Sequence, residues 1–237
     1  MKKMFLFISL VSLQMLHAQK LPFVNFNHLY LVIDSADLAA LQNSGFIKNK
    51  FAAFETRTTK ADNGEQWTGT YLQGLDNYIE LFDSAGVGYP TGNAGIAFSV
   101  DKVGEINQLD AALSKKYSTE ISLREKHSED KTIPWFNTLF INDSAFDSYS
   151  HIFFWVMEYK PEYFDYNHWK YENNELTRKI YLSKYEEQRN GKIVKRFTGV
   201  TFRATDDERE FILDFLLNCG YKQMDKNSVI SPEYFKI

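Results

Sequence analysis

A repeated order of predicted elements constrains this sequence most, because two copies of one supersecondary unit predict a paired architecture. In the first copy, alternating apolar residues predict a strand over residues 25–33, and Asp34 predicts the start of a helix. In the second copy, a strand over residues 95–100 precedes a helix that we expect Asp101 to cap. Three further strands follow in each copy, over residues 51–59, 66–73 and 77–83 and then over 118–125, 135–142 and 151–159. Both copies therefore read β-α-β-β-β.

A glycine-rich segment separates the two copies and divides the chain into regions. The stretch from Ala85 to Gly92 contains three glycines and a proline and reads as a linker. We therefore expect a first module over residues 19–90 and a second over 91–165. Residues 166–237 are expected to form a C-terminal αβαβ extension packed on the same domain, with a helix over 173–189, a strand over 197–203 and a helix that starts at Asp206 or Asp207. The predicted fold class is α+β.

The N-terminus has the pattern of a secretory signal peptide. Lys2 and Lys3 precede an apolar run from Met4 to Leu16, and Ala18 offers a small residue for cleavage. The run is too short to span a bilayer comfortably. We therefore expect residues 1–18 to be removed and the protein to be exported to the periplasm or the extracellular space, with no membrane association after cleavage.

Charge and cysteine content exclude other classes. The formal net charge is −4 and no run of basic residues is present, which argues against nucleic-acid binding. The single cysteine excludes an internal disulfide, so stability must come from packing.

One buried strand carries a carboxylate. Residues 68–83 read as a hairpin with a turn at residues 74–77, and in its second strand Tyr78, Glu80 and Phe82 share one face. A carboxylate between two aromatic residues is costly to bury unless it is paired or bound to a cation. Glu80 is therefore the first candidate for a functional group.

The segments Asn27-His-Leu-Tyr-Leu-Val-Ile-Asp34 and Tyr78-Ile-Glu-Leu-Phe82 resemble the vicinal oxygen chelate superfamily, in particular its glyoxalase-like members. The segment from Trp67 to Leu72 is also similar to a secreted bacterial branch of that superfamily. The resemblance covers residue 23 to about residue 165. It implies that the paired modules form a curved mixed sheet around a cleft, and that a divalent metal is held by the first and last strands of each module.

Carried over by position, the resemblance makes His28 and Glu80 metal ligands of the first module. In the second module, Gly95 occupies the position of His28 and cannot ligate, whereas Glu158 follows the last strand. One imidazole and two carboxylates could hold Zn²⁺, Mn²⁺ or Fe²⁺ with open positions. The alternatives are a structural histidine, pairing of Glu80 with Arg57, and a solvated Glu158 beside Lys160.

Other residues are expected to complete the cleft. Tyr30, Tyr71 and Tyr78 should border it and offer rings and hydroxyls to a ligand. Arg57 shares a strand face with Glu55 and could hold a substrate carboxylate, or the two could be ordinary partners. We assign Glu80, Arg57 and Tyr71 as catalytic candidates, and Tyr30 and Tyr78 as ligand-binding candidates.

Three functions are consistent with these residues. The first is a metal-dependent lyase, isomerase or dioxygenase acting on a small oxygenated molecule, as the resemblance implies. The second is a metal-free protein that binds a small molecule in the same cleft, and the third is an exported interaction module. We expect a monomer or a homodimer, because two modules in one chain can form an internal cleft.

Overall fold

The computed structural model describes residues 21–60, 66–128, 131–142 and 152–237 of the chain. The predicted signal peptide, residues 1–18, lies outside the described residues. Within the described ranges, none of the helices is long and apolar enough to cross a membrane.

The first module contains four strands and two short helical segments. They are β1 (Asn25–Ile33), α1 (Ser35–Asn43), the π-helix η1 (Ile47–Phe51), β2 (Ala53–Lys60), β3 (Gln66–Gln73) and β4 (Tyr78–Asp83). Helix α1 begins where the sequence predicts, because the Asp34 carboxylate accepts hydrogen bonds from the backbone N–H groups of Ala36 and Asp37.

The second module repeats this order after the short helix α2 (Ser84–Val87). It contains β5 (Ala94–Ser99), α3 (Glu105–Leu113), β6 (Ser118–Ser128), β7 (Lys131–Asn142) and β8 (Ile152–Tyr159). Helix α3 starts later than expected, because its N-cap is Gly104 with a φ of 90°. Asp101, the predicted cap, instead lies 3.6 Å from the Arg178 guanidinium.

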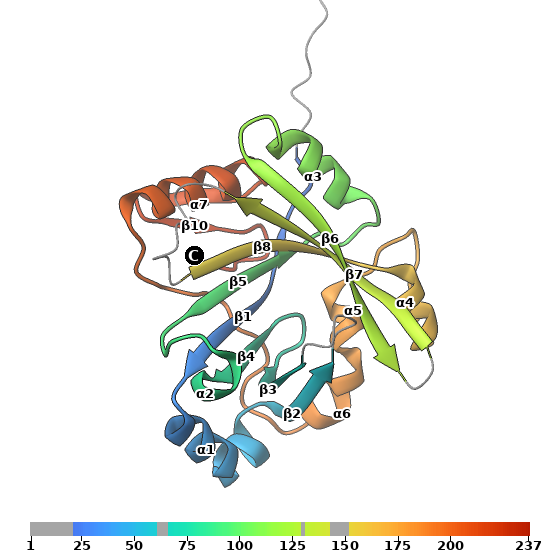
Figure 1. The fold of residues 1–237 in the computed structure, drawn as a ribbon, viewed down its shortest axis with the longest axis vertical. Helices are drawn as coiled ribbons and strands as arrows, with labels where there is room; N and C mark the ends of the chain where they lie inside the picture. The colour runs from blue at the N-terminus through green and yellow to red at the C-terminus, as the bar shows by residue number, and fades with distance from the viewer. Residues whose placement is uncertain (1–20, 61–65, 129–130, 143–151) are drawn as a thin grey trace, which may run out of the picture.

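The two modules join in one eight-stranded sheet (Figure 1). Its strand order is β2-β3-β4-β1-β5-β8-β7-β6, so each module contributes four adjacent strands and the modules meet between β1 and β5. Within each module the first and last strands pair in parallel, and β1 pairs with β5 in the antiparallel sense. The predicted α+β class with paired βαβββ modules in a curved mixed sheet is confirmed.

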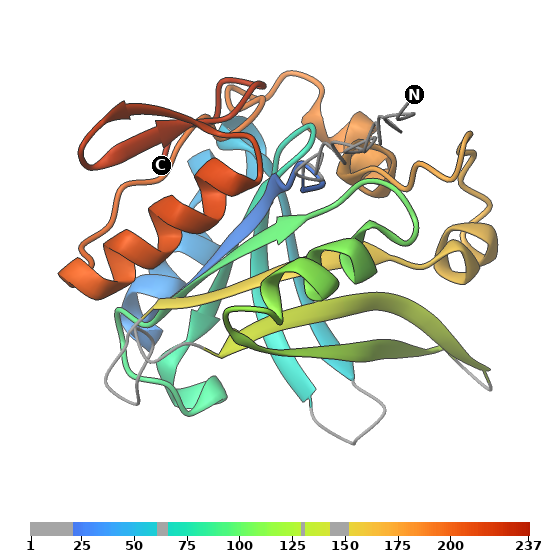
Figure 2. The same cartoon turned by 90° about the horizontal axis from the view of Figure 1, so that it is seen from above.

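The main core lies on one face of this sheet, under helices α3 and α7 (Asp206–Asn218). Strands β5 and β8 contribute Phe98 and Phe154, whose rings contact Phe215 of α7. Figure 2 shows α7 lying alongside the sheet, with the C-terminal hairpin of β9 (Lys222–Asp225) and β10 (Ser228–Ile230) beyond it. The opposite face of the sheet carries a second hydrophobic cluster, formed with residues of the C-terminal extension, and the cleft.

The C-terminal extension differs from two element predictions. The helix expected over residues 173–189 is three short pieces, α5 (Arg178–Leu182), the 3₁₀-helix η2 (Ser183–Tyr185) and α6 (Glu186–Arg189), preceded by α4 (Pro161–Tyr166). Asn173 and Asn174 have positive φ angles, which an α-helix does not allow. Helix α5 therefore starts after them, and Thr177 caps it. The strand expected over residues 197–203 pairs only through an isolated bridge between Gly199 and Lys236.

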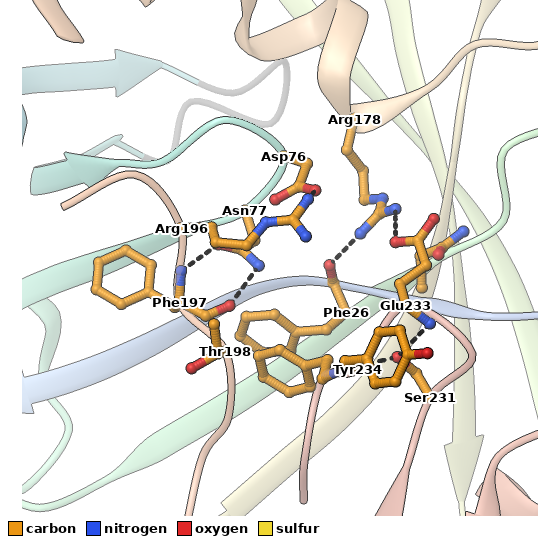
Figure 3. A pocket seen from close by; sticks show the side chains of 12 residues that line it. Phe26, Asp76, Asn77, Arg178, Arg196, Phe197, Thr198, Ser231, Glu233 and Tyr234 are labelled. Carbon is orange, nitrogen blue, oxygen red and sulfur yellow. Dashed lines mark hydrogen bonds and ion pairs between the residues drawn. The ribbon is translucent and has the colours of Figure 1, made fainter.

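Polar contacts attach this extension to the edge of the first module (Figure 3). Arg178 donates to the Phe26 carbonyl at 2.6 Å and to the Glu233 carboxylate at 3.3 Å. Asn77 of the β3–β4 turn exchanges two hydrogen bonds with the backbone of Phe197, at 2.9 and 3.0 Å, and Arg196 pairs with Asp76. The cavity among these residues has a volume of about 20 Å³, which is the size of one water molecule, so we interpret the region as a structural joint.

Candidate functional site

A cleft of about 380 Å³ lies on the concave face of the sheet, between the two modules. Its volume is in the range of small-molecule pockets. The first module contributes both ionisable and aromatic side chains, whereas the second contributes mainly aromatic and apolar ones. The lining residues used below are His28, Tyr30, Arg57, Trp67, Tyr71, Tyr78, Glu80, Trp135, Phe136, Trp155, Met157, Tyr159 and Tyr181.

Glu80 is a buried carboxyl group of β4 at the base of this cleft. The Tyr71 hydroxyl and the Trp67 indole N–H hydrogen-bond its side chain, and the charge of Arg57 lies nearby. Burial raises the pKa of Glu80 to about 7, because desolvation outweighs the hydrogen bonds and the positive charge that lower it. The group therefore exists in both protonation states near neutral pH.

A glycine makes this hydrogen-bonded pair possible. Gly69 lies on β3, and a Cβ atom there would stand 2.8 Å from the Tyr71 Oη atom and 2.9 Å from the Glu80 Oε1 atom. The Tyr71 hydroxyl and the carboxyl group therefore occupy the space that any other residue would fill. This explains the glycine inside a strand, where it otherwise weakens packing.

His28 lies beside Glu80 and is held in one tautomer. A register shift between Phe26 and His28 in the β1–β5 pairing inserts Asn27, whose Oδ1 atom is 2.9 Å from His28 Nδ1. Since an amide oxygen only accepts, Nδ1 carries the hydrogen and Nε2 keeps its lone pair, 3.9 Å from Glu80 Oε2. Burial lowers the pKa of His28 to about 3, so the imidazole is neutral at pH 7, and the Tyr78 ring stacks on it at 4.5 Å.

The structure contradicts the third predicted metal ligand. Along β8, Trp155, Met157 and Tyr159 face the cleft, so strand alternation directs Glu158 to the opposite face. There its carboxylate accepts hydrogen bonds from the backbone N–H groups of Ile106, at 2.9 Å, and Gly104. Gly104 has no side chain to cap helix α3, and the glutamate from β8 supplies the missing acceptor.

The second module has no ligand at the positions that match His28 and Glu80. Gly95 matches His28, so Ala97, two residues further along β5, matches Tyr30. Tyr30 pairs with Glu80, and Ala97 pairs with Trp155, so Trp155 occupies the place of the carboxylate. A Cβ atom at Gly95 would stand 2.7 Å from the Trp155 ring and would also collide with the Tyr30 ring. Within the described ranges, no group of three or more His, Cys, Asp and Glu side chains could hold a metal ion. The three predicted ligands thus do not form one site.

Arg57 lines the cleft, but internal partners hold its side chain. Its Nη1 atom donates to Glu55 Oε2 at 3.0 Å and to the Tyr185 hydroxyl at 3.3 Å. The guanidinium also lies 4.3 Å from the centre of the Tyr71 ring. The same-strand pairing with Glu55 that the sequence left open as an alternative is therefore present, although the positive charge still faces Glu80.

The three predicted tyrosines all line the cleft, in different roles. Tyr71 binds Glu80, Tyr78 stacks on His28, and the Tyr30 hydroxyl donates to Asn93 Oδ1 at 2.9 Å. The prediction missed other lining residues, among them Trp67, Trp135, Trp155, Tyr159 and Tyr181, and it missed Asn27, which holds His28 from outside the lining. Alternation along β8 groups Trp155 with Tyr159 on one face but does not say that this face meets the cleft, and no local signal connects Tyr181 of α5 to a cleft in the sheet.

Comparison with known proteins places this architecture in a family. The sequence matches the family of unknown function DUF5829 over residues 26–233. The chain belongs to this family. The match includes both βαβββ modules and most of the C-terminal extension, so the DUF5829 region comprises the complete sheet and its cleft.

The fold is also found in a solved structure. The crystal structure of a hypothetical protein from Staphylococcus aureus superposes with a TM-score of 0.56 at 11% sequence identity, covering 90% of this chain and 84% of that one. At this identity the likeness concerns the fold alone. No curated protein matches the sequence.

Proposed function

We propose that the cleft binds a small oxygenated molecule with a flat apolar body, and that Glu80 exchanges a proton with it. The observation that carries the proposal is the environment of Glu80: a buried carboxyl group, with a pKa of about 7, at the base of an aromatic cleft. A group that titrates near the working pH is suited to act as a general acid or base.

The neighbours of Glu80 support this role. Tyr71 and Trp67 orient the carboxyl group, and the neutral His28 offers a second acceptor 3.9 Å away. The surrounding rings provide flat surfaces for the ligand body and keep water from the carboxyl group. The resemblance gave Gly95 and Glu158 as the second-module positions, but the strand register matches Glu80 with Trp155, and neither Gly95 nor Trp155 is an ionisable residue, which favours chemistry by the first module alone.

The first experiment follows the protonation of Glu80 directly. Infrared difference spectra over a pH series report the C=O stretch of a protonated carboxyl group. We expect a band that disappears with a midpoint near pH 7 and is lost in Glu80→Gln, but persists in Glu158→Gln, which changes a carboxylate on the other face of the sheet. Titration of Glu80 near its ordinary value of 4.5 would overturn the proposal.

The second experiment tests the cleft as a binding site. Three of the four tryptophans, Trp67, Trp135 and Trp155, line it, so a bound aromatic molecule should quench their fluorescence. We expect saturable quenching by small aromatic ketones and acids, and its loss in Trp155→Ala. Binding that is unchanged in this variant would place the ligand elsewhere.

A second candidate is the metal-dependent form of the same site. With metal–ligand bonds of about 2.0–2.2 Å at a tetrahedral ion, two ligand atoms lie about 3.4 Å apart. The Nε2 and Oε2 atoms are 3.9 Å apart, so the two side chains would have to approach each other slightly to bind one ion. Water or substrate would then supply the remaining ligands. Metal content after incubation with Zn²⁺, Mn²⁺ or Fe²⁺ separates the two candidates: a stoichiometric ion that is lost in both His28→Ala and Glu80→Ala would favour this form.

Export remains part of the proposal and rests on the sequence pattern of residues 1–18. Fractionation of cells that express the full chain, with N-terminal sequencing of the product, tests it. A product that retains residues 1–18 in the cytoplasm would contradict export.

A further inference from the structure

A cluster of three basic side chains lies at one end of the cleft. We call Arg57, Lys126 and Lys184 the basic end. Arg57 itself lines the cleft, and the two lysine ammonium groups lie over rings that also line it. Lys184 Nζ is 4.7 Å from the centre of the Tyr181 ring, and Lys126 Nζ is 5.7 Å from the centre of the Trp135 ring.

The positive charge of the basic end is only partly compensated. Arg57 pairs with Glu55, but within the described residues neither lysine forms an ion pair with a carboxylate. Lys126 donates to the Tyr163 hydroxyl at 3.4 Å, which is a neutral partner. Among the described residues, Glu55 is therefore the one carboxylate within ion-pair distance of these three cations, although the charge of Arg57 also faces Glu80.

The three cations are close enough to disfavour one another. Burial lowers the pKa of Lys126, and the charges of Lys184 and Arg57 lower it further. Burial likewise lowers the pKa of Lys184 to about 8, with Arg57 as the next cause. Bringing a compact anion between them would relieve this repulsion.

An unused hydrogen-bond donor lies in the same wall. The Trp135 Nε1 atom is buried and has no hydrogen-bond partner among the described residues. The β6–β7 pairing shifts register at this point, so that Trp135 and Phe136 both line the cleft. A buried N–H without an acceptor costs free energy unless a ligand or water supplies one.

We propose that the basic end binds the anionic group of the ligand, a carboxylate or a phosphate, while the aromatic cleft holds its apolar body. The inference rests on the proposed function, because the same cleft holds the body. The ammonium groups of Lys126 and Lys184 and the guanidinium of Arg57 supply charged donors, and the rings beneath the lysines keep them in position.

A pair of ligands that differ only in charge tests this inference. Naphthoate and naphthamide share one aromatic body, and their binding is measured by quenching of tryptophan fluorescence and by calorimetry. We expect naphthoate to bind about tenfold more tightly than naphthamide, since the anion gains charge-assisted hydrogen bonds. The preference should weaken as salt is added.

Matched variants assign the preference to the basic end. The double variant Lys126→Gln, Lys184→Gln should bind both ligands with similar affinity and should leave the affinity for naphthamide unchanged. Lys179→Gln, which changes an exposed lysine of α5, should keep the full preference. Naphthyl phosphate, compared with naphthoate, then distinguishes a phosphate site from a carboxylate site.

The outcomes separate the inference from the proposed function. Equal affinity of the parent protein for naphthoate and naphthamide would overturn the inference and leave the cleft as a binding site. A preference that survives in the double variant would also overturn it. Absence of binding by either ligand would overturn the cleft-binding function, and the inference with it.

Discussion

The two βαβββ modules place different kinds of side chain in one cleft. At matching positions of the first and last strands, the first module has His28 and Glu80, and the second has Gly95 and Trp155. The first pair can exchange protons, whereas the second pair only creates space and an aromatic surface. The Trp155 ring lies 5.5 Å from the His28 ring, so the second module packs directly against the ionisable group of the first.

This difference shows that a repeated backbone need not repeat a site. The strand order is the same in both halves of the sheet, but burial shifts the pKa values of an acid–base pair only in the first, where Trp155 of the second module packs against His28. We infer that one module provides the chemistry and the other sets its environment. Three predictions test this division, from the largest expected effect to the smallest.

The largest effect concerns the pH dependence of stability. The pKa of His28 is lowered from 6.5 to about 3 in the folded state. As pH falls through that range, the free energy of unfolding should therefore decrease by about 5 kcal/mol. The folded-state pKa of Glu80 is raised from 4.5 to about 7, so its contribution is present at low pH and is lost as pH rises through that range, by about 3 kcal/mol. Between pH 4.5 and pH 6.5 the two residues change the free energy of unfolding in opposite directions as pH rises.

Single variants separate these two contributions. Urea denaturation over a pH series should show stability that rises with pH in Glu80→Gln, because the opposing contribution of Glu80 is then removed while that of His28 remains. In His28→Gln, stability should instead fall from pH 4.5 to about pH 7. Parallel curves for the two variants would show that the second module does not shift these pKa values.

The next effect comes from filling the space at Gly95. In Gly95→Ala, the new methyl group would collide with the Tyr30 and Trp155 rings, and we expect a loss of about 2 to 3 kcal/mol in the free energy of unfolding. Displacement of Trp155 should also admit water to Glu80 and return its pKa toward 4.5.

Thermal unfolding and the infrared band of Glu80 measure the two parts of this prediction. Gly104→Ala provides the control, because a Cβ atom at Gly104 meets nothing within 4 Å, although its φ of 90° adds backbone strain. The control should lose stability without a change in the pKa of Glu80. An unchanged Glu80 pKa in Gly95→Ala would argue against the role assigned to the second module.

The smallest effect concerns Glu158. In Glu158→Gln, the amide keeps one acceptor for the N–H groups at the start of α3 but loses the charge that favours a helix N-terminus, so we expect a loss of about 1 kcal/mol. Binding in the cleft and any uptake of metal should be unchanged, since the side chain faces α3. A loss of metal or ligand without a loss of stability would restore Glu158 to the site.

Local pattern accounts for the parts of the site that lie on regular strands. Alternation placed Tyr78 and Glu80 on one face of β4, and the repeat of the β-α-β-β-β order predicted the paired modules that the sheet contains. The same alternation defines two faces of β8. It does not say which face meets a cleft, and this is why Glu158 was assigned to the wrong side.

The remaining features depend on contacts between distant segments. The register shift at Asn27, which sets the tautomer of His28, arises in the pairing of β1 with β5, and Tyr181 reaches the cleft only because the C-terminal extension docks beside β2. The sequence by itself determined the modules, their order and the alternation of side chains, since these follow from periodicity within each segment. Only the tertiary structure decided which face is concave, which carboxylate is desolvated and which cations converge, because burial and electrostatic coupling are properties of the assembled sheet.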